Sequence, residues 1–200
     1  MSEFSRDEIE EAYRHYVMTG LVNEDWVAWS QLFTDDATYL DHFYGTFHGP
    51  EEIQKFLEST MSFAPHVYSV LEWYNIDGTQ IVYKVWNRAD NPEPGGPPIE
   101  FPSLQIIQYA GNGKWSSEED WWIVKEMKAF NAAYESASTA FDPNFKDKMS
   151  RADWGDWVDW ARPAEGHVAP SWLGREDVPK VTSVRDMSFG ERRTLDPRER

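Results

Sequence analysis

One acidic residue, Asp41, lies within an aromatic stretch of the chain and could do acid–base chemistry. Its neighbours include Tyr39, Phe43 and Tyr44, and a capped helix is expected to follow. A carboxylate among aromatic rings is poorly solvated, so its pKa should rise from about 3.9 toward the range useful for a general base. Asp41 is therefore the first catalytic candidate. The alternative is a strand-edge carboxylate that caps a neighbouring amide.

A second acidic group occurs near the end of the last expected strand, at residues 118–122. Alternation along a strand places Glu118, Asp120 and Trp122 on one face, which is expected to look inward. If Asp120 shares a pocket with Asp41, repulsion between like charges would divide the pair into an acid and a base. Three successive acids are also typical of a solvated strand edge, and that alternative stays open.

The hydrophobic period predicts the elements that position these groups. A capping box at Ser5 opens a first helix, Asn23 can cap a short second helix that carries apolar residues through position 33, and Gly49-Pro50 opens a third. Residues 37–44 alternate as a strand. Further strands are expected at 66–76, 79–89, 99–109 and 114–124, followed by a short helix at 125–138. Helices followed by a meander of strands predict an α+β fold with helices on one face of a curved antiparallel sheet.

The last part of the chain differs in composition, which suggests a first domain at residues 1–140 and a Trp-rich extension at 141–200. Trp154, Trp157 and Ala161 follow helical spacing, so a short amphipathic helix is expected over residues 151–162. Exposed tryptophans attract partners, so the extension should pack on the body or on a partner subunit. Its end is expected to be disordered.

Charge and composition argue against several classes of function. The chain has 35 Asp and Glu against 19 Lys and Arg, a net charge of −16, which would repel phosphate backbones and anionic membranes. We therefore expect neither nucleic acid nor a membrane as partner. The chain has no cysteine, and its five histidines lack metal-ligand spacing, so neither a metal nor a cofactor is expected. The start of the chain lacks a secretory pattern, which favours a soluble, cytoplasmic protein.

The order of these features resembles the NTF2-like superfamily and, within it, the SnoaL-like and ketosteroid isomerase-like domains. The resemblance covers roughly residues 8–125 and rests on Trp-x5-Leu-Phe-x-Asp-Asp-Ala-Thr-Tyr, an acidic residue in the strand, and Gly-x3-Gly-x-Glu-x-Ile. It implies a cone in which a curved antiparallel sheet wraps around three N-terminal helices, with a deep apolar pocket. The aromatic residues expected to bind substrate in that pocket are Trp26, Tyr39, Phe43, Trp73, Tyr83 and Trp122.

The resemblance also implies roles for individual residues. Asp41 matches the aspartate that shuttles a proton in ketosteroid isomerases, where an Asp base faces an oxyanion hole made of a Tyr and a protonated Asp. Tyr16 falls near that tyrosine. Gln105 stands where the family has the second acid, and its amide is a weaker hydrogen-bond donor, which argues against steroid isomerisation itself. His42 should point away from Asp41, either on the convex face or as a relay.

Limonene epoxide hydrolases share the fold, and Asp120 matches the position of their aspartate on the last strand. Those enzymes require an inward arginine on the third strand. Here that strand presents Tyr83, Val85 and Asn87 inward and Arg88 outward. Water activation by Asp120 is therefore the weaker alternative.

The preferred hypothesis is a cofactor-independent proton-transfer enzyme of isomerase, dehydratase or cyclase type. Its substrate would be a small hydrophobic carbonyl or hydroxyl compound such as a steroid, polyketide or terpenoid. Asp41 would act as base, Tyr16 and Gln105 would stabilise an oxyanion, and Asp120 or Asn87 would return the proton. The other hypothesis is a non-catalytic binding protein or accessory subunit. The resemblance implies a homodimer formed through the outer face of the sheet.

Overall fold

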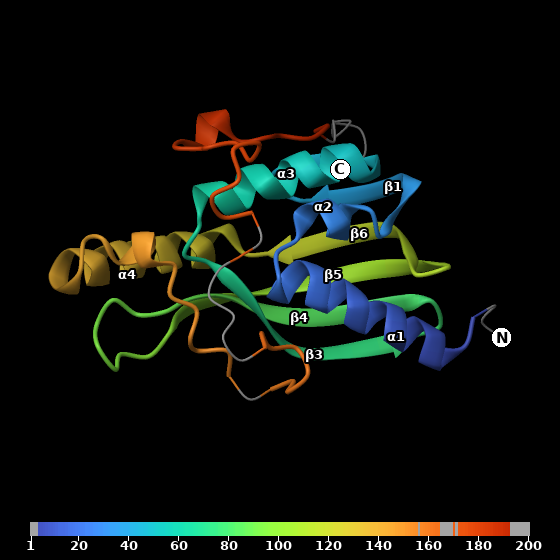
Figure 1. The fold of residues 1–200 in the computed structure, drawn as a ribbon, viewed down its shortest axis with the longest axis horizontal. Helices are drawn as coiled ribbons and strands as arrows, with labels where there is room; N and C mark the ends of the chain where they lie inside the picture. Colours follow the sequence, from blue (N-terminus) through green and yellow to red (C-terminus); the bar gives the residue numbers. More distant parts are fainter. Residues whose placement is uncertain (1–3, 156, 165–169, 171, 193–200) are drawn as a thin grey trace, which may run out of the picture.

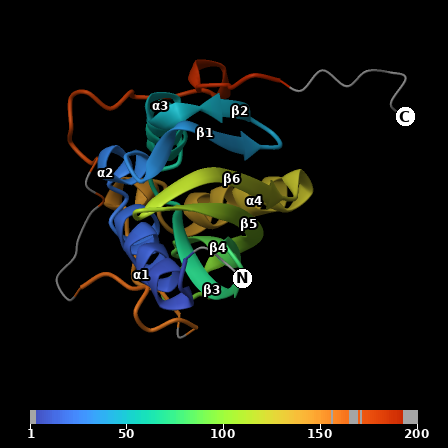
Figure 2. The ribbon, with the colours of Figure 1, turned by 90° about the vertical axis from the view of Figure 1, so that its right-hand side faces the viewer.

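The computed structural model describes residues 4–155, 157–164, 170 and 172–192, and these form an α+β fold. Six strands build one curved sheet in the order β2-β1-β6-β5-β4-β3, with helices packed over one face (Figures 1 and 2). The strands are β1 (Phe33–Asp41), β2 (Gly45–His48), β3 (Tyr68–Asp77), β4 (Gln80–Ala89), β5 (Ile99–Gly111) and β6 (Lys114–Trp122). The predicted fold class is confirmed, and β3 to β6 lie where the alternating pattern placed them.

The sheet is not wholly antiparallel, which corrects the sequence prediction. Strands β1 and β6 run parallel, with Asp41 opposite Asp120, whereas the four remaining pairs of neighbouring strands are antiparallel. The strand predicted over 37–44 is observed as β1 from Phe33 to Asp41, after which the chain turns at residues 42–44 and returns as β2. Parallel pairing brings the carboxyl ends of β1 and β6 to the same edge of the sheet. Both aspartates therefore reach one end of the fold.

Helices cover the inner face of this sheet. They are α1 (Arg6–Val17), the π-helical turn η1 (Met18–Val22), α2 (Trp26–Ser30), α3 (Gly49–Phe63) and α4 (Val124–Phe141). The Ser5 hydroxyl accepts the Glu8 N–H at 3.1 Å, so the predicted cap of α1 is confirmed. The second cap was predicted wrongly: Asp25, rather than Asn23, accepts the Ala28 N–H, and Phe33 begins β1 instead of ending α2.

One hydrophobic core joins the helices to the sheet. Tyr13 and Tyr16 of α1, Trp29 of α2 and Trp115 of β6 are all almost fully buried in it. Aromatic side chains of this size remove large apolar areas from water, and their edge contacts add to that gain. The ring of Tyr16 lies 4.9 Å from Trp29 and 5.5 Å from Trp115. The core therefore fixes α1 against the inner face of the sheet through contacts that include β6.

The chain after α4 returns over the body without the helix predicted at 151–162. In its place Trp154 is buried against the Tyr68 ring at 4.9 Å, and Trp157 is 58% exposed. Gly155 has a φ of +65°, a conformation that interrupts a right-handed helix. Asp156, which belonged to the predicted helix, lies outside the described residues, as does the end of the chain for which disorder was expected. Two short 3-10 turns occur in this part, η2 (Phe145–Lys148) and η3 (Val184–Asp186).

A buried polar cluster anchors the extension to the body. Glu24, 1% exposed, accepts a charged hydrogen bond from Arg151 and another from the indole of Trp172 at 2.6 Å. Arg151 also donates to the carbonyl oxygen of Pro65 at 3.0 Å.

No helix within the described part of the chain is long and apolar enough to cross a membrane.

Candidate functional site

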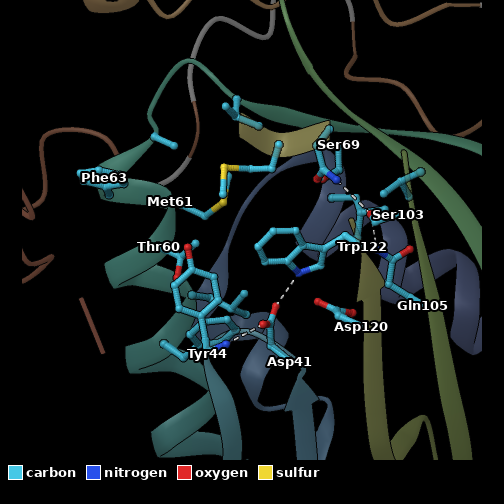
Figure 3. Close-up of a pocket in the computed structure, with 18 of the residues that line it drawn as sticks. Asp41, Tyr44, Thr60, Met61, Phe63, Ser69, Ser103, Gln105, Asp120 and Trp122 are labelled. Carbon is cyan, nitrogen blue, oxygen red and sulfur yellow. Dashed lines mark hydrogen bonds between the residues drawn. The ribbon is translucent and has the colours of Figure 1, made fainter. Parts of the chain in front are cut away.

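A pocket of about 230 Å³ opens between the inner face of the sheet and the helices. Its apolar side comes from α2, α3 and the start of α4, with side chains such as Trp26, Phe56 and Phe130. Its other side is the sheet, which contributes a group of polar residues (Figure 3). The pocket therefore combines a hydrophobic binding surface with polar groups gathered on one wall, as ligand sites usually do.

Three polar residues form a row across neighbouring strands on this wall. Asp41 of β1 pairs with Asp120 of β6, which pairs in turn with Gln105 of β5. Paired positions present their side chains on the same face of a sheet, so the three groups lie side by side. Figure 3 shows Asp41, Asp120 and Gln105 in this order, with the indole of Trp122 directed at Asp41. The row places two carboxyl groups and one amide next to each other on the pocket wall.

Asp41, 3% exposed, is held by three hydrogen-bond donors. Its Oδ1 accepts the backbone N–H groups of Phe43 at 2.7 Å and Tyr44 at 2.8 Å, and its Oδ2 accepts Nε1–H of Trp122 at 3.0 Å. Burial raises the pKa of Asp41, while these hydrogen bonds oppose the rise by stabilising the carboxylate. Asp41 therefore caps the turn after β1, as the structural alternative expected, and it also lines the pocket, as the catalytic hypothesis requires.

Asp120 has a different environment. Its Oδ2 accepts the Tyr39 hydroxyl at 2.5 Å, and its Oδ1 is buried with no hydrogen-bond partner among the described residues. Burial, together with repulsion from the carboxylates of Glu118 and Asp41, raises the pKa of Asp120 well above its ordinary value. Both causes shift Asp120 toward its protonated form, in which a carboxyl group is a hydrogen-bond and proton donor.

Glu118 lies behind Asp120 and was given no role from the sequence. Its carboxylate accepts the hydroxyl groups of Tyr16 and Tyr83, the latter at 3.1 Å. Burial raises the pKa of Glu118 to about 7, against the lowering effect of the Tyr16 hydrogen bond. The sequence signal that could have identified Glu118 was the alternation of β6, which placed its side chain inward together with that of Asp120. The expected role of Tyr16 as an oxyanion donor is not supported, because its hydroxyl is bound to Glu118 and it does not line the pocket.

A polar strip continues from this row along β5, β4 and β3. The Gln105 amide donates to the Ser103 hydroxyl at 2.6 Å, Asn87 donates to the same hydroxyl at 2.9 Å, and Ser69 contacts Asn87 at 3.5 Å. The Oε1 atom of Gln105 is buried and has no partner among the described residues. Gln105 was expected to donate to an oxyanion, but its unpaired atom is an acceptor, which suits a ligand hydroxyl group.

The domain model for SnoaL-like proteins matches residues 13–118, slightly more than half of the chain. The chain belongs to the SnoaL-like family. Among solved structures, an LEH-like epoxide hydrolase from M. tuberculosis is 16% identical with a TM-score of 0.52, and the match covers 67% of this chain and 96% of that one. A putative SnoaL-like polyketide cyclase from Shewanella denitrificans OS-217 is 17% identical with a TM-score of 0.51, over 64% and 98% of the two chains. No curated protein sequence matches this chain.

These likenesses place the SnoaL-like protein in the NTF2-like superfamily, as the sequence motifs indicated. At such low identity the solved structures establish the fold alone. The family match ends at residue 118, so the extension that follows α4 lies beyond it. Asp120 and Trp122 also lie beyond the match, and their part in the site comes from the geometry of this SnoaL-like chain.

Several residues proposed from the sequence do line the pocket of the SnoaL-like protein. They are Trp26, Tyr39, Asp41, Tyr83, Asn87, Gln105, Asp120 and Trp122. Two aromatic residues do not. Phe43 lies in the turn after β1 and is 41% exposed, because the strand ends three residues earlier than expected. Trp73 is equally exposed, because a register shift between Leu71 and Trp73 interrupts the alternation of β3.

His42 points away from the pocket, so a catalytic relay through this residue is not supported. Its Nε2 lies 2.9 Å from Oε1 of Glu119, and its ring contacts Trp121 at 4.0 Å between centroids. Both of these partners belong to the outer register of β6, opposite to Glu118 and Asp120. His42 is therefore part of the convex face, which was the alternative considered from the sequence.

Basic side chains are absent from the described residues that line the pocket. Arg88 of β4 is directed elsewhere, with its guanidinium bound to Glu100 at 2.6 Å and to the Asp153 carbonyl at 2.5 Å. In the described part of the chain, no three His, Cys, Asp or Glu residues are grouped as a metal site would require. The polar wall thus consists of carboxyl, amide and hydroxyl groups. These groups can accept, hold and donate protons.

Proposed function

We propose that this SnoaL-like protein is a cofactor-independent enzyme that transfers protons on small hydrophobic compounds with a carbonyl or hydroxyl group. The supporting observation is the contrast between two paired carboxyl groups in one pocket. Asp41 accepts three hydrogen bonds, which favours its carboxylate, whereas Asp120 has an unpaired oxygen and a pKa raised well above the ordinary value. Environments that separate two pKa values in this way define a base and an acid.

In the proposed reaction, the Asp41 carboxylate removes a proton from the carbon next to the substrate carbonyl. The electron pair of that C–H bond forms a carbon–carbon double bond, and the carbonyl π electrons move to oxygen. That oxygen takes the proton of Asp120, so one carboxyl group gains the proton that the other loses. General acid–base catalysis of this kind contributes about 10²- to 10⁴-fold each time a group is well placed.

The resulting enol can react in three ways that share this step. Return of the proton to a different carbon gives isomerisation. Departure of a hydroxyl group on the next carbon, protonated as water, gives dehydration. Attack of the enol carbon on a second carbonyl of the same molecule gives cyclisation. The polyketide cyclase name carried by one solved relative fits the last of these reactions.

Pocket size and charge narrow the class of substrate. A volume of about 230 Å³ lies below the range of roughly 300–1,000 Å³ usual for ligand sites, so a compound smaller than a four-ring steroid is favoured. The lack of basic groups among its described lining residues disfavours anionic compounds. The unpaired Oε1 of Gln105 favours a ligand that carries a hydroxyl group. Neutral mono- or bicyclic hydroxy-ketones of polyketide or terpenoid type meet all three conditions.

The two alternatives have less support. A pocket that only binds would favour an exposed Asp41 with an ordinary pKa, but Asp41 is buried and burial raises its pKa. Epoxide opening by activated water, the activity named for one structural relative, was expected to require an inward arginine on β4. Arg88 of that strand is bound to Glu100 outside the pocket.

Exchange of carbon-bound hydrogen in D₂O tests the proposal without knowledge of the natural substrate. A panel of mono- and bicyclic ketones and hydroxy-ketones is incubated with the protein, and deuterium incorporation next to the carbonyl is followed by mass spectrometry. We expect exchange in the wild type and in Asp77→Asn, a control at an exposed carboxylate in the β3–β4 turn. Asp41→Asn should slow it by about 100-fold or more. Exchange at an equal rate in Asp41→Asn, or none with ketones shown to bind, would overturn the proposal.

A further inference from the structure

The last described part of the chain contributes directly to the pocket. Residues 187–191, here called the C-terminal strap, lie along α3 and the edge strand β2 (Figures 1 and 2). The strap belongs to the extension beyond residue 118, outside the family match. Its contacts are therefore a property of this chain, and they need an explanation of their own.

Four hydrogen bonds attach the backbone of the strap to the body, three of them to backbone groups and one to a side chain. The Ser188 N–H donates to the Ser59 hydroxyl of α3 at 2.9 Å, and the Gly190 N–H donates to the Tyr44 carbonyl at 3.0 Å. Glu191 and Thr46 exchange two further bonds, at 2.8 and 2.9 Å, as an antiparallel bridge on β2. The strap therefore extends the sheet at its exposed edge, where strand groups otherwise lack partners.

Only glycine fits at position 190. A Cβ atom there would lie 2.3 Å from the carbonyl oxygen of Thr46, well inside van der Waals contact with backbone that the bridge itself fixes. Gly45 meets the strap from the other side, where a Cβ would lie 2.8 Å from the Gly190 carbonyl carbon. This close approach of two backbones makes the bridge sensitive to a single side chain.

Tyr44 connects the strap to the proposed catalytic base. Its carbonyl oxygen accepts the Gly190 N–H, and its own N–H donates to Oδ1 of Asp41 at 2.8 Å. The ring of Phe189 lies 5.6 Å from the ring of Tyr44 and covers the same turn. The strap thus restrains the turn that presents two N–H groups to Asp41.

The strap also supplies one wall of the pocket. Met187 is 6% exposed and lines the same cavity as Asp41 and Asp120. An unbranched thioether side chain adapts to the shape of an apolar ligand, so it can set which ligands fit. The strap therefore contributes to the site in two ways: its backbone is hydrogen-bonded to the turn that holds Asp41, and the side chain of Met187 lines the pocket.

We propose that the C-terminal strap is a functional part of the site, in which Gly190 positions Asp41 through Tyr44 and Met187 determines ligand size. The description of Asp41 as a base rests on the proposed function, whereas the contacts of the strap are independent of that proposal. Gly190 is a positioning residue in this scheme, and Met187 is a specificity-determining residue.

The positioning role is tested in the full-length chain with Gly190→Val, which should break the bridge. The matched control is Val184→Ala, an exposed residue in the turn η3 just before the strap. We expect Gly190→Val to increase hydrogen exchange of the Phe43 and Tyr44 amides at least about tenfold and to shift the Trp122 indole N–H resonance, with both unchanged in the control. Ser59→Ala, which removes one clamp, should give a smaller change in the same direction and serves if Gly190→Val does not fold. Unchanged amide exchange in Ser59→Ala and in folded Gly190→Val would overturn the positioning role.

The specificity role is tested by the binding of 2-naphthol and the larger 9-phenanthrol, measured by fluorescence. Met187→Ala should shift the affinity ratio toward 9-phenanthrol by about tenfold, whereas Val184→Ala should leave the ratio unchanged. An unchanged ratio in Met187→Ala would overturn this role. These readouts do not require turnover. If no ketone exchanges deuterium but the strap variants alter amide exchange and ligand preference, the proposed function fails and the role of the strap stands.

Discussion

Asp41 and Asp120 occupy paired positions on the parallel strands β1 and β6, yet their oxygen atoms are satisfied in opposite ways. Asp41 accepts two backbone N–H groups and one indole N–H, whereas Asp120 accepts one tyrosine hydroxyl and keeps a buried oxygen unpaired. Because hydrogen bonds stabilise the charged form of one acid more than the other, Asp120 should keep its proton to a higher pH than Asp41. This asymmetry makes separate predictions for the two residues.

Replacement of the two aspartates should affect stability differently. Asp41→Ala leaves the N–H groups of Phe43 and Tyr44 without their acceptor and should cost about 1–3 kcal/mol. Asp120→Asn keeps an oxygen for the Tyr39 hydroxyl and removes a repelling carboxylate, so its effect should lie within about 1 kcal/mol or be stabilising. Urea denaturation at pH 7 measures both. A larger loss in Asp120→Asn than in Asp41→Ala would contradict the assignment.

The buried carboxyl group of Glu118 should make the fold less stable as pH rises. Its pKa is raised from the ordinary value of 4.5 to about 7, so the folded state binds more protons than the unfolded state between these values. Stability then falls with increasing pH across that window, because ∂ΔG/∂pH follows the difference in bound protons, unfolded minus folded. Glu118→Gln should reduce this slope, leaving the part that comes from the raised pKa of Asp120, and should be more stable than the wild type at pH 8. Thermal unfolding from pH 4.5 to 8 checks it, and an unchanged slope in the variant would count against Glu118.

The part of the site on β6 could be predicted because alternation is a strong signal in a regular strand. The inward register of Glu118, Asp120 and Trp122 follows from it, and the hairpins around Gly78 and Gly113 set the borders of the strands. The parallel pairing of β1 with β6 could not be predicted in the same way. It depends on contacts between segments about eighty residues apart, which local patterns do not encode.

Asp41 itself explains why the first strand ends earlier than the sequence predicted. The alternation of Tyr39, Asp41 and Phe43 suggested a continuous strand, but the Asp41 side chain captures the N–H groups of Phe43 and Tyr44 and turns the chain. The helix predicted in the extension failed for a tertiary reason. Arg88 binds the Asp153 carbonyl, and Trp154 packs on Tyr68, so local helical spacing was overridden.

The outer face of the sheet should mediate self-association. Trp121 is 50% exposed and Leu104, paired with it on β5, is 41% exposed, so an apolar surface extends over two strands. We expect a homodimer in which this face is covered. Trp121→Glu would place a second carboxylate near Glu119 and should shift the protein to monomer in light scattering, with the β3–β4 turn variant Asp77→Asn unchanged. A wild type that is monomeric at micromolar concentration would refute this expectation.

The extension should contribute to stability mainly through the buried pair of Glu24 and Arg151. Removal of Arg151 takes an ion-pair partner from the buried Glu24, so Arg151→Met should cost about 3–5 kcal/mol, whereas replacement of both by Met should cost less than the sum of the single changes. A double-mutant cycle in urea measures this coupling. The exposed pair Lys55 and Glu51 on α3 provides the control, because solvent screens it and its coupling should be much smaller than that of the buried pair. Equal coupling in the two cycles would mean that the extension is held by its tryptophans, Trp154 and Trp172, rather than by the ion pair.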